Sequence, residues 1–233
     1  MGLAHSPNTV TDGLVLCLDA ANRRSYSGVG TAWNDLSGNG NNGMLINGPT
    51  FNNSSAGGIV LDGTDDYISI NNMSNYQLKS INHITVDIWF KSNSFAGFSR
   101  KYIFENRDTN TNNPFPIFVD RTSDTSGSMK IYNNADTIVQ TVYTNITYNV
   151  CYIIDTTVTL NNILFYVNGY KSVYSYNVSH PINSSNIMYL GRAYPSSSYR
   201  WNGPIYKFSL YNKILSDKDV LQNFNATRGR FGI

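Results

Sequence analysis

The chain has 233 residues, of which 41% are hydrophobic, 13% are aromatic and only 14% are charged. This length suits one large domain with a substantial core. The formal net charge of +2 gives no basic face for nucleic acid, and there is no apolar run of the length that a membrane span or a signal-peptide core requires. We therefore expect neither nucleic acid nor a membrane as a partner.

Short strand-like segments follow one another along the chain. Residues 1–12 are expected to form a loose N-terminal arm, and residues 13–233 one domain. The segments are rich in β-branched and aromatic residues, and clusters of Gly, Asn and Asp separate them. They are residues 14–18, 44–46, 59–61, 67–70, 84–90, 102–104, 117–119, 129–132, 138–143, 150–154, 164–167, 170–176, 187–190 and 205–211.

Alternation within two of these segments predicts which side chains face the core. The even-numbered residues of 84–90 are all apolar and should face inward, whereas the odd-numbered ones include Asp87 and Trp89 and should form a second, aromatic-bearing face. The same alternation in residues 205–211 predicts that Tyr206 faces the same side as the other even-numbered residues of that segment.

Two local signals fix turns and ends. Asn168 and Gly169 separate two strand-like segments, and this pair tolerates the positive φ angles of a tight hairpin turn. Near the C-terminus, Ser216 followed by Asp219 is a carboxylate form of the capping box that begins helices. An apolar stripe at helical spacing follows, formed by Val220, Leu221 and Phe224. The chain is thus predicted to be all-β, with two antiparallel sheets packed face to face and one short C-terminal helix.

Four motifs occur in a fixed order along nearly the whole chain. They are G-L-V-L-C-L-D-A at 13–20, W-N-D-L-S-G-N-G-N-N-G at 33–43, G-I-V-L-D-G-T-D-D-Y-I-S-I at 58–70, and W-N-G-P-I followed by Y-N-K-I-L-S-D-K-D-V at 201–220. Together they resemble laminin-G-like domains of the concanavalin A-like lectin/glucanase superfamily, and this resemblance implies a two-sheet antiparallel jelly-roll sandwich. The ending N-A-T-R-G-R-F-G at 225–232 resembles versions of this domain found in virion proteins of tailed phages.

The superfamily includes glucanases, so an enzyme has to be considered. The resemblance implies that a hydrolase would carry two glutamates alternating along one strand, because retaining glycosidases need two carboxylates on the same side of the substrate. Glu105 is the only glutamate of the chain, and Asp108 falls on the opposite side of a strand. We therefore expect no enzymatic activity.

Oxygen-rich, glycine-containing loops are candidates for a calcium ion, which the resemblance places at the rim of the sandwich. The candidate ligands are Asp35 and Asn39 in one loop, and Asp62 and Asp65 in another. The alternative is that these side chains bond to their own loop backbones without any ion. Both explanations stay open at this stage.

A glycan site needs aromatic platforms for the CH faces of sugar rings, together with planar hydrogen-bond donors for the hydroxyl groups. The loop after residue 191 supplies both kinds of side chain. The candidates are Arg192, Tyr194, Tyr199, Arg200 and Trp201. Trp201 also lies in the motif that defines the fold, where packing is the alternative role. The face with Asp87 and Trp89 is a second candidate.

The two cysteines, Cys17 and Cys151, lie inside strand-like segments and lack metal-ligand spacing. We expect buried free thiols, since a disulfide would require the two strands to be neighbours.

Two functional interpretations follow. The first is a non-enzymatic virion structural protein, a surface decoration or fibre-associated module whose lectin-like fold adheres to glycans. Its partners would be other capsid or tail proteins and surface glycans, its place the virion surface, and a homo-oligomer is left open. The alternative is a dedicated carbohydrate-binding adhesin or receptor-binding lectin of a viral tail or a cell surface.

Overall fold

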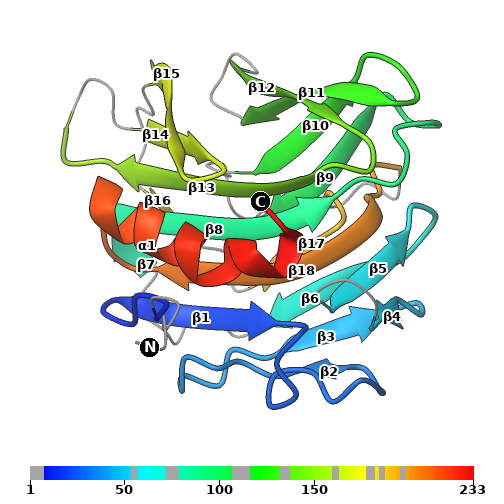
Figure 1. Ribbon diagram of the computed structural model, residues 1–233, viewed down its shortest axis with the longest axis horizontal. Helices are drawn as coiled ribbons and strands as arrows, with labels where there is room; N and C mark the ends of the chain where they lie inside the picture. Colours follow the sequence, from blue (N-terminus) through cyan, green and yellow to red (C-terminus); the bar gives the residue numbers. More distant parts are fainter. Residues whose placement is uncertain are drawn as a thin grey trace, which may run out of the picture.

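A computed structural model describes residues 8–53, 57–71, 79–106, 116–131, 137–158, 163–176, 182–183, 187–194 and 198–233. Two antiparallel sheets of eight strands each pack face to face, and helix α1 lies across the front sheet in Figure 1. The predicted sandwich with one C-terminal helix is confirmed. The described residues contain no helix with the length and hydrophobicity of a membrane span.

The first sheet has the order β15-β14-β13-β8-β18-β5-β4, with β1 paired to β18. Its strands are β1 (Leu14–Asp19), β4 (Thr50–Asn52), β5 (Gly58–Asp62), β8 (His83–Lys91), β13 (Thr147–Asp155), β14 (Ile163–Val167), β15 (Tyr170–Tyr176) and β18 (Asn202–Tyr211).

The second sheet has the order β12-β11-β10-β9-β17-β6-β3-β2, and β7 and β16 form a separate pair. These strands are β2 (Ala32–Trp33), β3 (Gly43–Ile46), β6 (Tyr67–Asn71), β7 (Lys79–Ile81), β9 (Arg100–Glu105), β10 (Ile117–Arg121), β11 (Ser126–Ile131), β12 (Thr137–Tyr143), β16 (Ile182–Asn183) and β17 (Ile187–Leu190).

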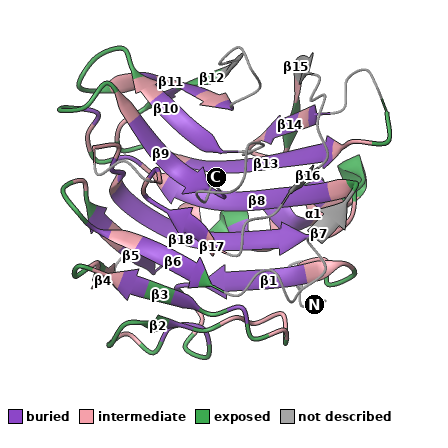
Figure 2. Cartoon of the chain, turned by 180° about the vertical axis from the view of Figure 1, so that it is seen from behind, coloured by how far each residue is buried: buried purple, intermediate pink, exposed green. Residues whose placement is uncertain are grey.

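Apolar side chains from the inner faces of both sheets form one core. Figure 2 shows that buried residues follow the strands of both layers. In β8, Ile84, Val86, Ile88 and Phe90 all belong to this core, whereas Trp89 packs on the other side of the sheet. The alternation predicted for this strand is therefore confirmed.

The predicted direction of Tyr206 is wrong. Phe208 and Leu210 lie in the core, but Tyr206 packs on the opposite face of the first sheet against Phe231. The pairing of β18 with β8 shifts register between Ile205 and Lys207. Such a bulge inserts one residue, so the two-residue period of the strand is broken at Tyr206.

Helix α1 (Asp217–Arg228) begins at the predicted cap. The hydroxyl of Ser216 accepts a hydrogen bond from the backbone N–H of Asp219 at 3.2 Å, and the Asp219 carboxylate accepts one from the backbone N–H of Ser216 at 3.0 Å. This reciprocal pair satisfies two N–H groups that would otherwise lack partners, which confirms the capping box. A short 3-10 helix, η2 (Gly229–Phe231), continues the chain.

Helix α1 and η2 cover the outer face of the first sheet. Phe224 stacks on Trp89 with a ring-centroid distance of 5.6 Å, and Phe231 stacks on it at 4.6 Å. Trp89 is 0% exposed and Asp87 is 4% exposed. The second face predicted from β8 exists, but it cannot serve as a glycan surface because the C-terminal elements bury it.

The described part of the predicted N-terminal arm is bonded to this same layer. Gln222 Nε2 donates to the carbonyl oxygen of Asn8 at 2.7 Å, and Val10 N donates to Asn223 Oδ1 at 2.8 Å. Lys213 also pairs with Asp12. Residues 8–12 are thus tied to α1 and its entry, whereas residues 1–7 lie outside the described residues, and the boundary at residue 13 stays a prediction.

The β14–β15 hairpin turns as its sequence predicts. Asn168 has a φ of 51° and Gly169 a φ of 78°, the positive values that an Asn-Gly turn requires. The added Cβ of any other residue at position 169 would also lie 2.7 Å from the Phe224 ring. The turn therefore approaches the covering helix closely.

Both cysteines are free and buried, as predicted. Cys17 lies on β1 and Cys151 on β13, and β18 and β8 separate these strands in the first sheet. Burial raises the pKa of both thiols.

Candidate functional site

The predicted glycan loop, residues 192–201, packs Ala193, Tyr194 and Tyr199 on the outer face of the second sheet. It leaves β17 at Gly191, whose φ of +88° and whose contact with Leu61 leave no room for a side chain. The loop closes where the N–H of Trp201 donates to the carbonyl oxygen of Gly191 at 3.0 Å. Residues 195–197 lie outside the described residues.

Tyrosines of the sheet and the start of this loop form one cluster around Arg192. The ring of Tyr194 stacks on Tyr189 of β17 at 5.8 Å and 5° between planes, and Tyr67 of β6 meets Tyr189 edge-on at 6.0 Å. The Arg192 guanidinium carbon lies 4.6 Å from the ring centre of Tyr67 and 5.0 Å from that of Tyr189. These distances are typical of cation–π contacts.

Arg200 completes this tyrosine–arginine cluster, which consists of Tyr67, Tyr189, Arg192, Tyr194 and Arg200. Its guanidinium carbon lies 5.3 Å from the centre of the Tyr67 ring. Burial, together with the positive charge of Arg192, lowers the pKa of Arg200 from its ordinary value, while Asp65 and Asp62 act in the opposite direction. The cluster thus contains two neighbouring guanidinium groups, with carboxylates close by.

The end of the loop packs on a second aromatic group of the same sheet face. Tyr199 lies 6.0 Å from Tyr102 of β9, which in turn stacks on Phe118 of β10 at 5.2 Å. Ala193 joins these side chains. Because β10, β9, β17 and β6 are consecutive in the sheet, aromatic side chains extend across four adjacent strands.

An ion-pair network stands beside the second aromatic group. Arg100 donates to both oxygens of Asp120, at 2.6 and 3.0 Å, and Lys130 Nζ donates to the same carboxylate at 2.7 Å. The Arg100 guanidinium also lies 4.1 Å from the ring centre of Phe118. Burial opposes ionisation of Asp120, but these hydrogen bonds and charges outweigh it and lower the pKa of the carboxyl.

Trp201, the fifth predicted glycan residue, is not part of this surface. It is 0% exposed and lies in the core between the sheets, edge-on to Phe90 at 5.4 Å and to Phe95 at 6.2 Å. A ring without exposed surface cannot stack on a sugar. The structure therefore corrects the prediction for Trp201 and assigns it the packing role.

The predicted calcium ligands separate into two loops with different properties. The Asp35 carboxylate accepts four hydrogen bonds, from the N–H groups of Cys17, Ser37 and Asn41 and from the Ser37 hydroxyl, at 2.7 to 3.0 Å. The Asn39 side-chain amide donates to backbone carbonyl groups of β1 at 3.2 and 3.3 Å. Since hydrogen-bond donors already surround the carboxylate, this loop does not fit a cation.

The turn between β5 and β6 brings three carboxylates together. Ligand atoms of Asp62, Asp65 and Asp66 all lie within 4.8 Å of one another. One oxygen of Asp62 accepts from the N–H groups of Thr64 and Asp65, and burial, followed by repulsion from Asp62 and Asp65, raises the pKa of Asp66. This turn has the residues to share a cation, with Asp66 in addition to the two predicted ligands, and a calcium ion there stays a prediction.

Glu105, the only glutamate, is at the end of β9 and is 1% exposed. Asp108 lies outside the described residues. A carboxylate buried to this extent has no open side for a sugar ring.

Sequence reasoning missed Tyr67 and Tyr189. Each stands one residue away from core positions of its strand, and the register pairs Tyr189 with Ser69 on β6. Alternation places each tyrosine outside the core, but only the pairing of strands far apart in the sequence brings the two rings together.

Comparison with known proteins agrees with the observed fold. A family model described as the concanavalin A-like lectin/glucanases superfamily matches residues 62–221, which is more than half of the chain. No curated protein sequence matches the chain.

Several solved structures share the fold at low sequence identity. Domain 4 of an extracellular arabinanase from Geobacillus stearothermophilus, in complex with arabinotriose, matches with a TM-score of 0.64 and 16% identity, over 90% of this chain and 97% of that one. Trypanosoma rangeli sialidase matches with a TM-score of 0.68 and 14% identity, over 95% of this chain but 35% of the sialidase. The binding domain of botulinum neurotoxin DC, in complex with rat synaptotagmin II, matches with a TM-score of 0.66 and 14% identity, over 94% of this chain and 52% of that one.

Proposed function

Because the chain belongs to the concanavalin A-like lectin/glucanases superfamily, we propose that it is a non-enzymatic structural module of a phage virion that binds glycans. In this proposal it decorates the particle surface or is associated with a fibre, and its partners are other capsid or tail proteins and surface glycans. A homo-oligomer on the particle is compatible with this role.

The tyrosine–arginine cluster is the observation that supports glycan binding. Tyr67, Arg192 and Tyr194 are each partly exposed, so ring faces and guanidinium N–H groups reach the surface together. Stacked rings supply apolar faces for the CH side of a sugar, and guanidinium groups supply planar donors for its hydroxyl groups. The contacts among the rings hold these groups in place before any ligand arrives, which lowers the entropy cost of binding.

The place of the protein on a virion rests on sequence resemblance. The ending at residues 225–232 is similar to that of domains in tailed-phage virion proteins. In this structure the same residues form the end of α1 and η2, which cover the first sheet. This ending thus serves the fold, and its phage association is an inference from sequence alone.

The absence of hydrolase activity is likewise proposed on physical grounds. Glycoside hydrolysis of the retaining type needs two accessible carboxyl groups about 5 Å apart. Glu105 is buried, and in the β5–β6 turn the carboxylates of Asp62 and Asp66 accept hydrogen bonds from the turn backbone. Asp62 and Asp65 are exposed there, but partial desolvation of Asp62 is outweighed by backbone hydrogen bonds that lower its pKa, and Asp66, whose pKa is raised as a proton donor requires, is buried.

The alternative is a dedicated carbohydrate-binding adhesin or receptor-binding lectin. It is favoured by two of the similar structures, an arabinanase domain in complex with arabinotriose and a botulinum neurotoxin binding domain in complex with rat synaptotagmin II. The two roles differ in location and not in the glycan site.

A glycan array with purified protein tests the binding proposal. We expect wild-type protein to bind a subset of glycans, and Tyr194→Ala and Arg192→Gln to lose this binding while their unfolding curves match that of wild type. Tyr170→Ala is the matched control, because Tyr170 is 77% exposed on the β14–β15 turn of the other sheet. Wild-type protein without glycan binding, or a Tyr194→Ala variant that binds like wild type, would contradict the proposal.

Location is tested separately. Gold-labelled antibodies against the chain should decorate intact phage particles in electron micrographs. Unlabelled particles from a lysate that contains the soluble protein would contradict the virion role and favour a cell-surface adhesin.

A further inference from the structure

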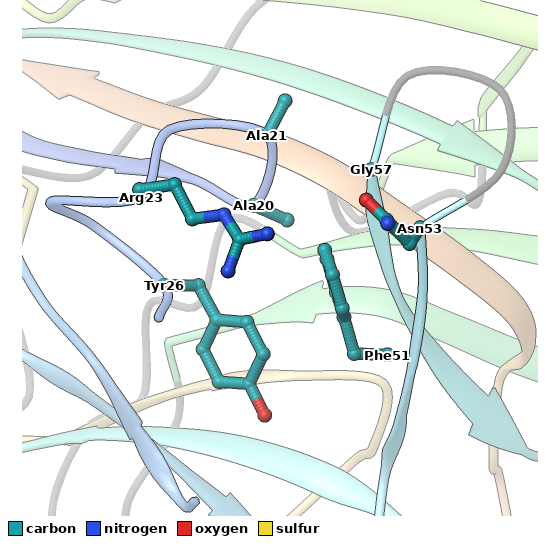
Figure 3. A pocket seen from close by; sticks show the side chains of 7 residues that line it. All are labelled: Ala20, Ala21, Arg23, Tyr26, Phe51, Asn53 and Gly57. Atoms are coloured by element: carbon teal, nitrogen blue, oxygen red, sulfur yellow. The ribbon is translucent and has the colours of Figure 1, made fainter. Parts of the chain in front are cut away.

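A pocket of about 220 Å³ lies at the edge of the first sheet, between the loop that follows β1 and strand β4 (Figure 3). Its lining residues are Ala20, Ala21, Arg23, Tyr26, Phe51, Asn53 and Gly57. The pocket shares no residue with the tyrosine–arginine cluster. Neither the sequence analysis nor the comparison with known proteins points to a role for this pocket.

Two aromatic rings form the apolar wall. Tyr26 and Phe51 lie 5.1 Å apart between ring centres, with 54° between their planes, so they form a corner. Tyr26 is fixed there because its side chain is 3% exposed and its hydroxyl donates to the carbonyl oxygen of Gly30 at 2.9 Å. Phe51 is partly exposed. A fixed aromatic corner with one exposed ring offers a face to a ligand.

The backbone closes the pocket on a third side. Gly57 has a φ of +65°, and a Cβ at this position would lie 2.8 Å from the Cα of Ala21. Only glycine permits this approach between the β1 loop and the start of β5. The pocket is therefore built into the packing of three segments.

Polar groups face one another across the remaining space. Figure 3 shows the Arg23 guanidinium directed into the gap between Tyr26 and Phe51, and the Asn53 side chain on the opposite wall. Arg23 donates one hydrogen bond, from Nη1 to the carbonyl oxygen of Ser27 at 2.9 Å. Within the described part of the chain, no carboxylate forms an ion pair with it. Its other N–H groups are thus available to an anion from outside.

Size restricts the ligand to a single ring. A cavity of roughly 150 Å³ accommodates one benzene ring, so the volume of about 220 Å³ has room for one six-membered ring with its substituents. A planar guanidinium binds a carboxylate through two parallel hydrogen bonds, and an amide pairs with hydroxyl groups. An aromatic face, an amide and a guanidinium without an acidic partner together match a sugar ring that carries a carboxylate.

We propose that this pocket is a second saccharide site, which binds one ring of an acidic sugar with its carboxylate on Arg23 and its apolar face against Phe51. The site is independent of the tyrosine–arginine cluster, so each can exist without the other. A surface polysaccharide that contains uronic acids would then contact the protein at two separate places.

Titration with glucuronic acid and with glucose, followed by ¹H–¹⁵N NMR spectra, tests the proposal. We expect glucuronic acid to shift the side-chain amide signal of Asn53 and the backbone signal of Gly57 in a saturable way, and glucose to bind at least about tenfold more weakly. Arg23→Gln should weaken glucuronic acid binding by about tenfold or more. Arg24→Gln is the matched control, because Arg24 is an exposed neighbour that does not line the pocket.

The other outcomes each overturn the proposal. Absence of shifts at Asn53 and Gly57, or equal affinity of wild type and Arg23→Gln, would exclude the pocket as the site. Equal binding of glucose would exclude the acidic specificity, and equal shifts with inorganic phosphate would identify a simple anion site. Tyr194→Ala should leave these shifts unchanged, so failure here is distinct from failure of the proposed lectin function.

Discussion

Substitution of Trp201 tests whether this residue stabilises the core or binds glycan. The side chain is 0% exposed and contacts Phe90 and Phe95 in the core. A buried tryptophan removes roughly 200 Å² from water, which at about 25 cal/mol per Å² is an upper estimate of about 5 kcal/mol. Measured Trp→Ala losses are about 3–5 kcal/mol, so we expect Trp201→Ala to lower the free energy of unfolding by about 4 kcal/mol.

For a chain of this length, such a loss lowers the melting temperature by roughly 8–16 °C. Urea unfolding followed by far-UV circular dichroism measures the loss of unfolding free energy, because this signal does not depend on the removed indole. Trp201→Phe keeps a ring in the core and removes an indole N–H that has no hydrogen-bond partner among the described residues, so its loss should be less than half as large. A loss below about 1 kcal/mol for Trp201→Ala, together with lost glycan binding, would refute the assignment of Trp201 to the core.

Three further predictions concern the helix and the ion pairs. Phe224→Ala should lower the free energy of unfolding by about 3–4 kcal/mol, because the ring is buried against Trp89. Leu221 is 45% exposed on the same helix, so Leu221→Ala should change this free energy by less than about 0.5 kcal/mol. Equal losses for the two variants would contradict the packing of α1 on the first sheet. Ser216→Ala removes the helix cap and should lower the free energy of unfolding by about 1 kcal/mol, which thermal unfolding measures. An unchanged melting temperature would argue against a stabilising cap. The folded state lowers the pKa of Asp120, so its ionised form stabilises the fold above the unfolded pKa of about 4, and this stabilisation is lost as pH falls through the folded pKa. Asp120→Asn should therefore be less stable than wild type at pH 7 and similar to it at about pH 2. A difference in urea midpoint between the two proteins that does not change with pH would contradict this.

Features encoded within a few neighbouring residues could be predicted from the sequence. The capping box of Ser216 and Asp219 is complete within four residues, and the Asn168–Gly169 turn depends only on the φ angles that these two residues tolerate. Alternation in β8 gave both of its faces correctly because the strand pairs without interruption with β13. These local signals, together with the other strand-like segments and the family resemblance of the four motifs, predicted the fold.

Features that depend on pairing between distant segments could not be predicted in the same way. The bulge at Tyr206 arises from the register between β18 and β8, and the alternation of residues 205–211 alone does not reveal it. Trp201 has the same residue type and loop position as a sugar platform, and only its burial against Phe90 and Phe95 reveals its role. Arg23 lies in the loop after β1 and Phe51 on β4, and the two form a pocket only after folding.

In the proposed function the two layers of the sandwich have different tasks, and strand β18 lies within the first of them. Its apolar side chains fill the core, while its outer face is sealed under α1 and η2, so the first sheet presents no aromatic surface at its centre. In the proposed functions, recognition is then left to the outer face of the second sheet and to the pocket at the sheet edge. Arg200 reaches the tyrosine–arginine cluster from the residue just before Trp201, which the core holds rigidly. A side chain that is already held in place loses less conformational entropy on binding a ligand. We therefore expect substitutions of the exposed side chains of loop 192–201 to change glycan affinity and to leave the stability of the sandwich intact.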